Sequence, residues 1–297
     1  MGTFVGAYWD VRDESIDECA ERIAALLPRL AEIDPLLSGW RDKAMTKKEA
    51  LAAPVVGTDR DDLIQRLRRG LMPGAQPSAE GAGFSVFWWN GHSNKDGGAT
   101  LNVTNAGSRI ARLPRAVVVN IPDQSTAAQR YSASAAKQIL QAVIETFEPK
   151  RAVWLDDSAR DAQTEPDVVQ PDGSVKLGKL VGQPAGWATY LADSEPTHFD
   201  RRSLPGSAAI DRVGDGTLVL LGDDPANPPL GDVLAVRAAM GYRVPQGESQ
   251  AAPTVSPSDS PRTAALRGEE RESAAGSLPH QPEQGDEGAP GQSRNPT

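Results

Sequence analysis

One stretch of this sequence has the spacing of a phosphate-binding loop. Gly173 and Gly178-Lys179 stand as far apart as the glycines and the lysine of a P-loop, whose backbone amides cradle phosphate groups. A P-loop also needs a Ser or Thr after the lysine to hold Mg²⁺, and a buried strand before the first glycine. Here Leu180 follows the lysine, and Pro171-Asp172 precedes the first glycine. We therefore interpret the stretch as a turn in a surface loop.

Two short motifs, taken together, have the acidic residues and the lysine of metal-dependent restriction-type nucleases. They are Pro122-Asp123 and Glu148-Pro149-Lys150. That chemistry needs the acid and the lysine two positions apart on one rigid strand, so that both reach one divalent ion. Here a proline separates them at the predicted end of a helix. A partial calcium-loop match at residues 94–98 lacks the downstream Glu and is better explained as a turn.

Few other residues could carry catalysis or bind a metal. His92, His198 and His280 are the only histidines, and no pair has metal-ligand spacing. Cys19, the single cysteine, falls on an apolar helix face without a neighbouring His or Lys to form a thiolate, so we expect a buried thiol. The sequence predicts no cofactor, no metal and no catalytic residue. An enzyme that works through carboxylates and a metal remains the alternative.

Tryptophan stands out instead, with six residues against five Phe and four Tyr. Trp88 and Trp89 are consecutive in a predicted strand, so their side chains point to opposite faces of the sheet. One belongs to the core, and the other needs cover from a helix, a loop or a partner. Tryptophan is among the favoured anchors of protein interfaces.

Two acidic pairs, Asp156-Asp157 and Asp223-Asp224, follow predicted strands and fall on loops. Solvated turns are the simplest interpretation of each pair. Together with the net charge of −9 they also offer a surface for basic side chains. An acidic chain is a poor candidate for binding nucleic acid, which requires clustered Lys and Arg.

Apolar residues make up 39% of the chain, below the usual ~45–50%, and the deficit lies at one end. From residue 246 onward the only larger apolar residues are Val255, Leu266 and Leu278, while prolines recur. Such a segment cannot bury enough apolar surface to offset its ordering entropy. We predict a folded domain over residues 1–243 and a disordered Pro/Ser/Glu-rich tail over residues 244–297.

Periodic patterns predict the elements that must position these residues. Helices are expected behind the capping boxes Ser15–Glu18 and Thr46–Glu49, and over residues 59–69, 135–147 and 227–240. Pro28 should kink or break the first helix. Strands are expected at residues 4–9, 84–89, 100–104, 116–121, 151–155, 186–191, 208–213 and 217–221.

In this order, hairpins outnumber parallel crossovers. The predicted fold class is therefore α+β, with a mainly antiparallel sheet of about six to eight strands and helices packed largely on one face. The first residues lack a basic region and a long apolar run, so they do not form a signal peptide. No stretch approaches the ~18 apolar residues that span a bilayer. We expect a cytoplasmic protein unless another component exports it.

Short motifs follow one another in a fixed order along the chain. They are Tyr8-Trp9, Ser15, Glu18-Cys19-Ala20, Arg22, Asp34-Pro35, Trp40, residues 48–51, Pro54, Gly83-Phe84, Trp89-Asn90-Gly91, Gly186-Trp187, residues 189–191 and residues 214–218. This ordered set resembles the immunity protein 52 family of bacterial polymorphic toxin systems. The resemblance spans about residues 6–240. The departures are Pro28 and a long insertion between residues 156 and 183.

The resemblance implies a non-catalytic antidote that binds a cognate toxin, often one with a restriction-endonuclease-type domain. A nuclease active site is basic around its metal-binding carboxylates. An acidic partner would therefore plug that site or hold the toxin in an inactive shape. A few desolvated aromatic anchors would supply affinity, and charge complementarity would speed association.

The family does not supply the binding residues, so they are inferred from this sequence. We expect the toxin to contact Trp40, Trp89, Asp156 and Asp157, with Trp187 next. A carboxylate enzyme would instead show a cleft with at least three converging titratable groups. A third hypothesis, an adaptor that loads a toxin onto a secretion machine, would depend on the tail.

Overall fold

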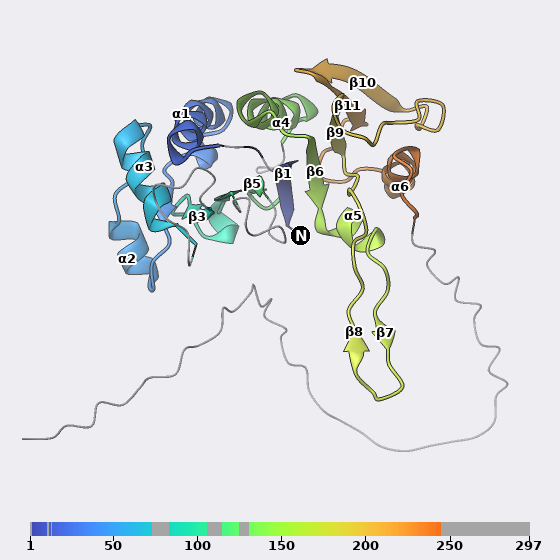
Figure 1. The fold of residues 1–297 in the computed structure, drawn as a ribbon, viewed down its shortest axis with the longest axis horizontal. Coiled ribbons are helices and arrows are strands. Elements are labelled where there is room, and N and C mark those ends of the chain that lie inside the picture. Colours follow the sequence, from blue (N-terminus) through green and yellow to red (C-terminus); the bar gives the residue numbers. More distant parts are fainter. Residues whose placement is uncertain are drawn as a thin grey trace, which may run out of the picture. The chain divides into compact units, whose positions relative to one another are not determined.

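Nine described strands, every neighbouring pair antiparallel, form the sheet that organises the fold (Figure 1). The computed structural model describes residues 2–10, 12, 14–72, 83–105, 115–124 and 131–244. All of them fall in one unit, Met1–Ser249. The predicted tail, apart from Val244, lies outside the described residues.

The sheet order is β10-β11-β9-β6-β1-β5-β4-β3-β2, which puts the first strand of the chain in the middle. The strands are β1 (Thr3–Trp9), β2 (Arg41–Asp42), β3 (Phe84–Trp89), β4 (Thr100–Asn105), β5 (Arg115–Ile121), β6 (Arg151–Asp156), β9 (Ala188–Ala192), β10 (Ala208–Val213) and β11 (Gly216–Leu221). A separate hairpin joins β7 (Val168–Val169) to β8 (Val175–Lys176). The predicted α+β class and antiparallel sheet are confirmed.

The sheet has one strand more than the upper end of the predicted range. The extra strand is β2, whose two residues pair with Trp88 and Trp89. A two-residue strand has no periodicity of its own, so a sequence pattern cannot reveal it. All eight predicted strands are present, and Gly214 and Gly216 frame the turn between β10 and β11 as their Asp-Gly chemistry suggested.

Helices α1 (Ile16–Ile33) and α4 (Ala133–Phe147) cover the face of the sheet that carries Val5, Ala7, Val117 and Val119, all fully buried (Figure 1). The other described helices are α2 (Lys47–Ala52), α3 (Arg60–Arg69), α5 (Asp157–Ala162) and α6 (Leu230–Ala239), with short 3-10 turns η1 (Pro35–Leu37) and η2 (Asn94–Asp96). Helix α1 packs against α3 and α4, and α4 contacts β1 and β6. No described helix is long and apolar enough to cross a membrane.

Helix α1 begins at the predicted capping box and continues past Pro28. Ser15 and Glu18 form the capping box, in which each side chain accepts the other residue's amide. A kink or a break was expected at Pro28; the helix continues through Pro28 to Ile33, so the break does not occur. Pro28 lies on the exposed side, where the chain loses one backbone hydrogen bond while the buried stripe of the helix stays intact.

The two halves of the sheet differ in their cover. Strands β6 and β9 are buried on both faces, and α5 packs against β6. Figure 1 shows α5 and α6 apart from α1 and α4. Strand β3, in contrast, alternates buried and open positions, with Ser85 and Phe87 exposed. The outer face of the β3 half is therefore the open side of the sheet.

Candidate partner-binding surfaces

The five residues predicted to contact a partner lie at one edge of the sheet, in two groups. Because β4, β5, β1 and β6 pair antiparallel in succession, β3 and β6 run the same way and end at the same edge. Four strand spacings separate β3 from β6, or roughly 19 Å at ~4.8 Å each. One group holds Trp40 and Trp89; the other holds Asp156, Asp157 and Trp187.

Trp40 and Trp187 are core residues at this edge. Each is only 1% exposed. The indole Nε1 of Trp187 donates to the carbonyl of Gly222 at 3.2 Å, and its ring stands edge-to-face with Trp154 at 5.8 Å. Both tryptophans are therefore out of a partner's direct reach in this structure, and their burial holds the edge in shape from within.

Asp156 and Asp157 lie at the start of α5. Asp156 is the N-cap of this helix, and its Oδ1 accepts the amide of Ala159 at 2.9 Å. It is buried, as expected for a cap at the end of a core strand. Asp157 is half-buried, accepts the amide of Gly2 at 2.6 Å and pairs with Arg160 at 3.1 Å. Of this pair, Asp157 alone offers surface to a partner.

Trp89 borders a shallow cavity of 390 Å³ between the open sheet face and α2, here named the Trp89 groove. Its Nε1 donates to the carbonyl of His92 at 2.6 Å, which fixes the ring against its own loop. Phe87 lies two positions earlier on the same face and is 40% exposed. The groove is lined by Lys43, Ala44, Met45, Thr46, Lys47, Ala50, Phe87, Trp89, Ser93 and Thr100.

Sequence reasoning missed most of this groove, although signals were present. Side chains alternate between the two faces along a strand, so Ser85, Phe87 and Trp89 point to the same face. The polar Ser85 indicates that this is the outer face. Met45 precedes the N-cap Thr46, where an apolar residue commonly packs on the fourth helical residue. In the structure it stays 96% exposed at the rim of the groove.

The β7–β8 hairpin carries a second set of exposed apolar side chains. Val169 and Val175 face each other across the pair, at 71% and 54% exposure, and Leu177, just after β8, is also exposed. The stretch with P-loop spacing forms the turn and second strand of this hairpin. Gly173 has a positive φ of 83°, and Asp172 accepts the amide of Ser174, so the predicted turn is confirmed.

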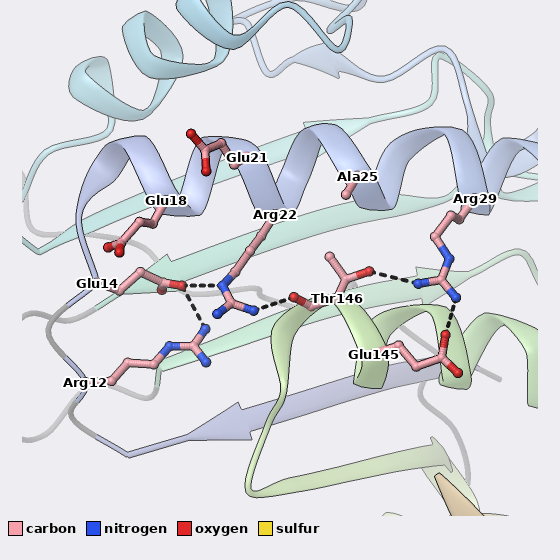
Figure 2. A pocket seen from close by; sticks show the side chains of 9 residues that line it. All are labelled: Arg12, Glu14, Glu18, Glu21, Arg22, Ala25, Arg29, Glu145 and Thr146. Atoms are coloured by element: carbon pink, nitrogen blue, oxygen red, sulfur yellow. Dashed lines mark hydrogen bonds and ion pairs between the residues drawn. The ribbon is translucent and has the colours of Figure 1, made fainter. Parts of the chain in front are cut away.

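A charged cleft of 460 Å³ lies between α1 and the end of α4 (Figure 2). Arg12 donates to the carbonyl of Phe147 at 2.7 Å, and Arg22 donates to that of Thr146 at 2.6 Å. These carbonyls belong to the last turn of α4, whose acceptors have no partner within the helix. Both arginines also reach Glu14, at 2.8 and 3.0 Å. The cleft is a seam that fastens two helices together.

Burial raises the pKa of Glu14 despite the two arginines beside it. The other carboxylates of the cleft are also engaged. Glu18 completes the cap of α1, Glu21 pairs with Arg60 at 3.0 Å, and Glu145 pairs with Arg29. Four titratable acids therefore line a pocket without converging on a common point, as Figure 2 shows for Glu18 and Glu21.

The nuclease-like motifs do not meet. Asp123 follows the end of β5, and Lys150 precedes the start of β6. These strands run parallel on either side of β1, so the two residues lie at opposite edges of the sheet. Lys150 instead donates to Ser194 at 2.6 Å. Within the described ranges, no group of three or more His, Cys, Asp or Glu is placed to hold a metal ion.

The Trp89 groove presents aromatic side chains of the kind that is enriched at protein interfaces. The family model for Immunity protein 52 matches residues 2–228, and the chain belongs to this family. This confirms the resemblance drawn from the sequence motifs, and it places the chain in an immunity protein family that is typically non-enzymatic.

Comparison with solved structures finds a match to a chain described as Pseudomonas aeruginosa T6SS protein PA0821. It is 14% identical, with a TM-score of 0.48 over 81% of this chain and 75% of that one. No curated protein sequence matches the chain.

Proposed function

We propose that this immunity protein neutralises its cognate toxin by direct one-to-one binding, and that the toxin carries a restriction-endonuclease-type nuclease domain. Family membership supports an antidote, and the net charge of −9 supports a partner with basic surface. A nuclease acts on nucleic acid, so the antidote would meet it in the cytoplasm.

The observation that carries the proposal is the Trp89 groove. A large aromatic ring that is held in place by its own loop loses little freedom when a partner covers it, which suits it to anchor an interface. We place the toxin contact at Trp89 and extend it along the sheet edge to Asp157. Trp40, Asp156 and Trp187 support that edge from beneath, through burial and the α5 cap.

Co-expression in a bacterium with the toxin encoded by the neighbouring gene tests this function. The full chain is expected to restore growth and to purify with the toxin in a one-to-one complex. Cells that express the toxin alone should lose intact chromosomal DNA. If growth is restored without a complex, direct binding is wrong; if the toxin kills without degrading nucleic acid, the nuclease assignment is wrong.

A further inference from the structure

The Trp89 groove has the opposite charge to the molecule that carries it. Lys43 and Lys47 line it and are exposed, and no carboxylate is among its lining residues. Acids in the flanking segments are already engaged, and one of them, Asp96, accepts the hydroxyl of the groove residue Ser93. Glu49 closes the capping box with Thr46, and Asp42 binds Arg66 and accepts the indole N–H of Trp88 at 2.9 Å. The groove is thus a basic, aromatic patch on an acidic protein.

The two lysines lie beside an apolar floor. The Nζ of Lys43 lies 5.6 Å from the centre of the Phe87 ring, within the range of a cation–π contact. Ala50 of α2 is buried beneath the groove, and the ring of Trp89 borders it. An apolar side chain can therefore enter between Met45 and Phe87 while an anionic group beside it pairs with the lysines.

We infer that the groove takes an acidic segment of the toxin, with an apolar side chain inserted in the groove and carboxylates paired to Lys43 and Lys47. This inference rests on the proposed function. At the groove, the toxin's contacting segment would be acidic, whereas the rest of a nuclease surface is expected to be basic. Charge complementarity selects this occupant, since a basic segment would lose water against two lysines that form no ion pair with any described residue.

The test is the affinity of full-length charge-reversal variants for the neighbouring toxin with its active site inactivated. Lys43→Glu with Lys47→Glu is expected to weaken binding about tenfold or more at low salt, and the loss should shrink at high salt as screening grows. Arg201→Glu with Arg202→Glu changes the net charge equally at an exposed turn and is the matched control. It should leave affinity within about twofold.

Met45→Ala provides a second variant that cannot act through folding, because this side chain is almost entirely exposed. Its expected effect is a loss of affinity that salt does not change. Unchanged or tighter binding by the Lys43/Lys47 variant would overturn the acidic-segment inference while leaving the proposed function intact. Absence of binding by the unmodified chain would overturn both.

Discussion

Trp88 and Trp89 show how neighbouring residues of one type take different tasks. Trp88 is fully buried, and its indole N–H bonds to Asp42; Trp89 lies on the open face and bonds to its own loop. Strand alternation predicts that the two rings point apart. Ser85 and Phe87 extend the outer row, so parity alone identifies Trp89 as the surface residue.

Trp89→Ala is expected to weaken toxin binding by about 2 kcal/mol or more, the usual size of an aromatic anchor, with little change in stability. Calorimetric titration and urea unfolding measure the two effects. Trp187→Ala is the contrasting variant, expected to destabilise the fold by about 3–5 kcal/mol because it empties a core site. Unchanged affinity in folded Trp89→Ala would remove Trp89 from the interface.

Trp40 and Trp187 mark the limit of sequence reasoning at this scale. Trp40 lies just before the two-residue β2, outside any periodic pattern. Trp187 fell in the predicted strand 186–191 and lies just before β9, whose residues are all buried, so alternation does not show whether it faces the core. Their burial comes from elements distant in the chain, such as the Gly222 carbonyl that receives the Trp187 N–H. Composition singled out the tryptophans, and only the packing shows which of them lie in the core and which lie at the surface.

At the scale of elements, the seam between α1 and α4 joins helices that the sequence predicts separately. Arg22 contacts Glu14, Glu148 and the carbonyl of Thr146. Replacing it with alanine leaves a helix-end acceptor and a buried carboxylate short of partners. We expect Arg22→Ala to cost about 1–3 kcal/mol of unfolding free energy.

The cost of Arg22→Ala should also depend on pH. Burial raises the pKa of Glu14 above its ordinary value, so the folded protein holds that proton more tightly than the unfolded chain. The contribution of Glu14 to stability therefore falls as pH rises through the folded-state pKa. Removing one of the two opposing cations enlarges this effect, so the cost should be greater near pH 8 than near pH 4.

Arg60→Ala is the comparison for this measurement. Arg60 also joins two acids of α1, Asp17 and Glu21, but all three side chains are exposed. Its loss should change stability little, and the change should vary little between the two pH values. Equal costs for Arg22→Ala and Arg60→Ala, in urea unfolding at both pH values, would mean that the seam adds no more than a surface ion pair.

The β7–β8 hairpin is an element that the core does not need. Its apolar side chains are mostly exposed, and β7 and β8 pair with each other alone among the described strands. Replacing residues 167–178 with a short Gly-Ser linker should change unfolding free energy by less than about 1 kcal/mol. Loss of cooperative urea unfolding in this variant would show that the insertion is part of the folding unit.

Sequence patterns predicted elements well where a period or a cap was long enough to detect. Helix α1, the β3–β4 pair and the β10–β11 turn all follow from apolar spacing or turn residues. Helix α5 was missed because its six residues are mostly polar and its cap, Asp156, ends a buried strand. Short helices and strands are stabilised mainly by contacts with neighbouring elements, and the local sequence does not reveal those contacts.

At the scale of the whole molecule, the net charge and the charge of the Trp89 groove favour partner surfaces of opposite sign. The total of −9 governs long-range steering, whereas the Trp89 groove, where we propose that contact is made, is basic. Strand order could not be read from the sequence either, because pairing between distant segments decides which residues share an edge. Trp89 and Asp157 lie 68 positions apart in the chain and at the same edge of the sheet.

A chain ending at residue 243 is expected to protect cells as well as the full chain does. The described part of the protein reaches residue 244, and the Trp89 groove and the sheet edge lie wholly within it. Growth rescue and toxin affinity should both match the full chain. A folded 1–243 chain that no longer protects cells would favour the adaptor hypothesis, since an adaptor was expected to depend on the tail.

The central place of β1 has a consequence for how quickly protection can follow synthesis. β1 pairs with β5 and β6, so the middle of the sheet cannot form until the roughly 150 residues between β1 and the end of β6 have been translated. At ~5–20 residues per second that wait is roughly 7–30 s. A newly induced cell therefore passes through an interval in which the antidote is being made but cannot yet act. Inherited protein, rather than fresh translation, would have to cover that interval.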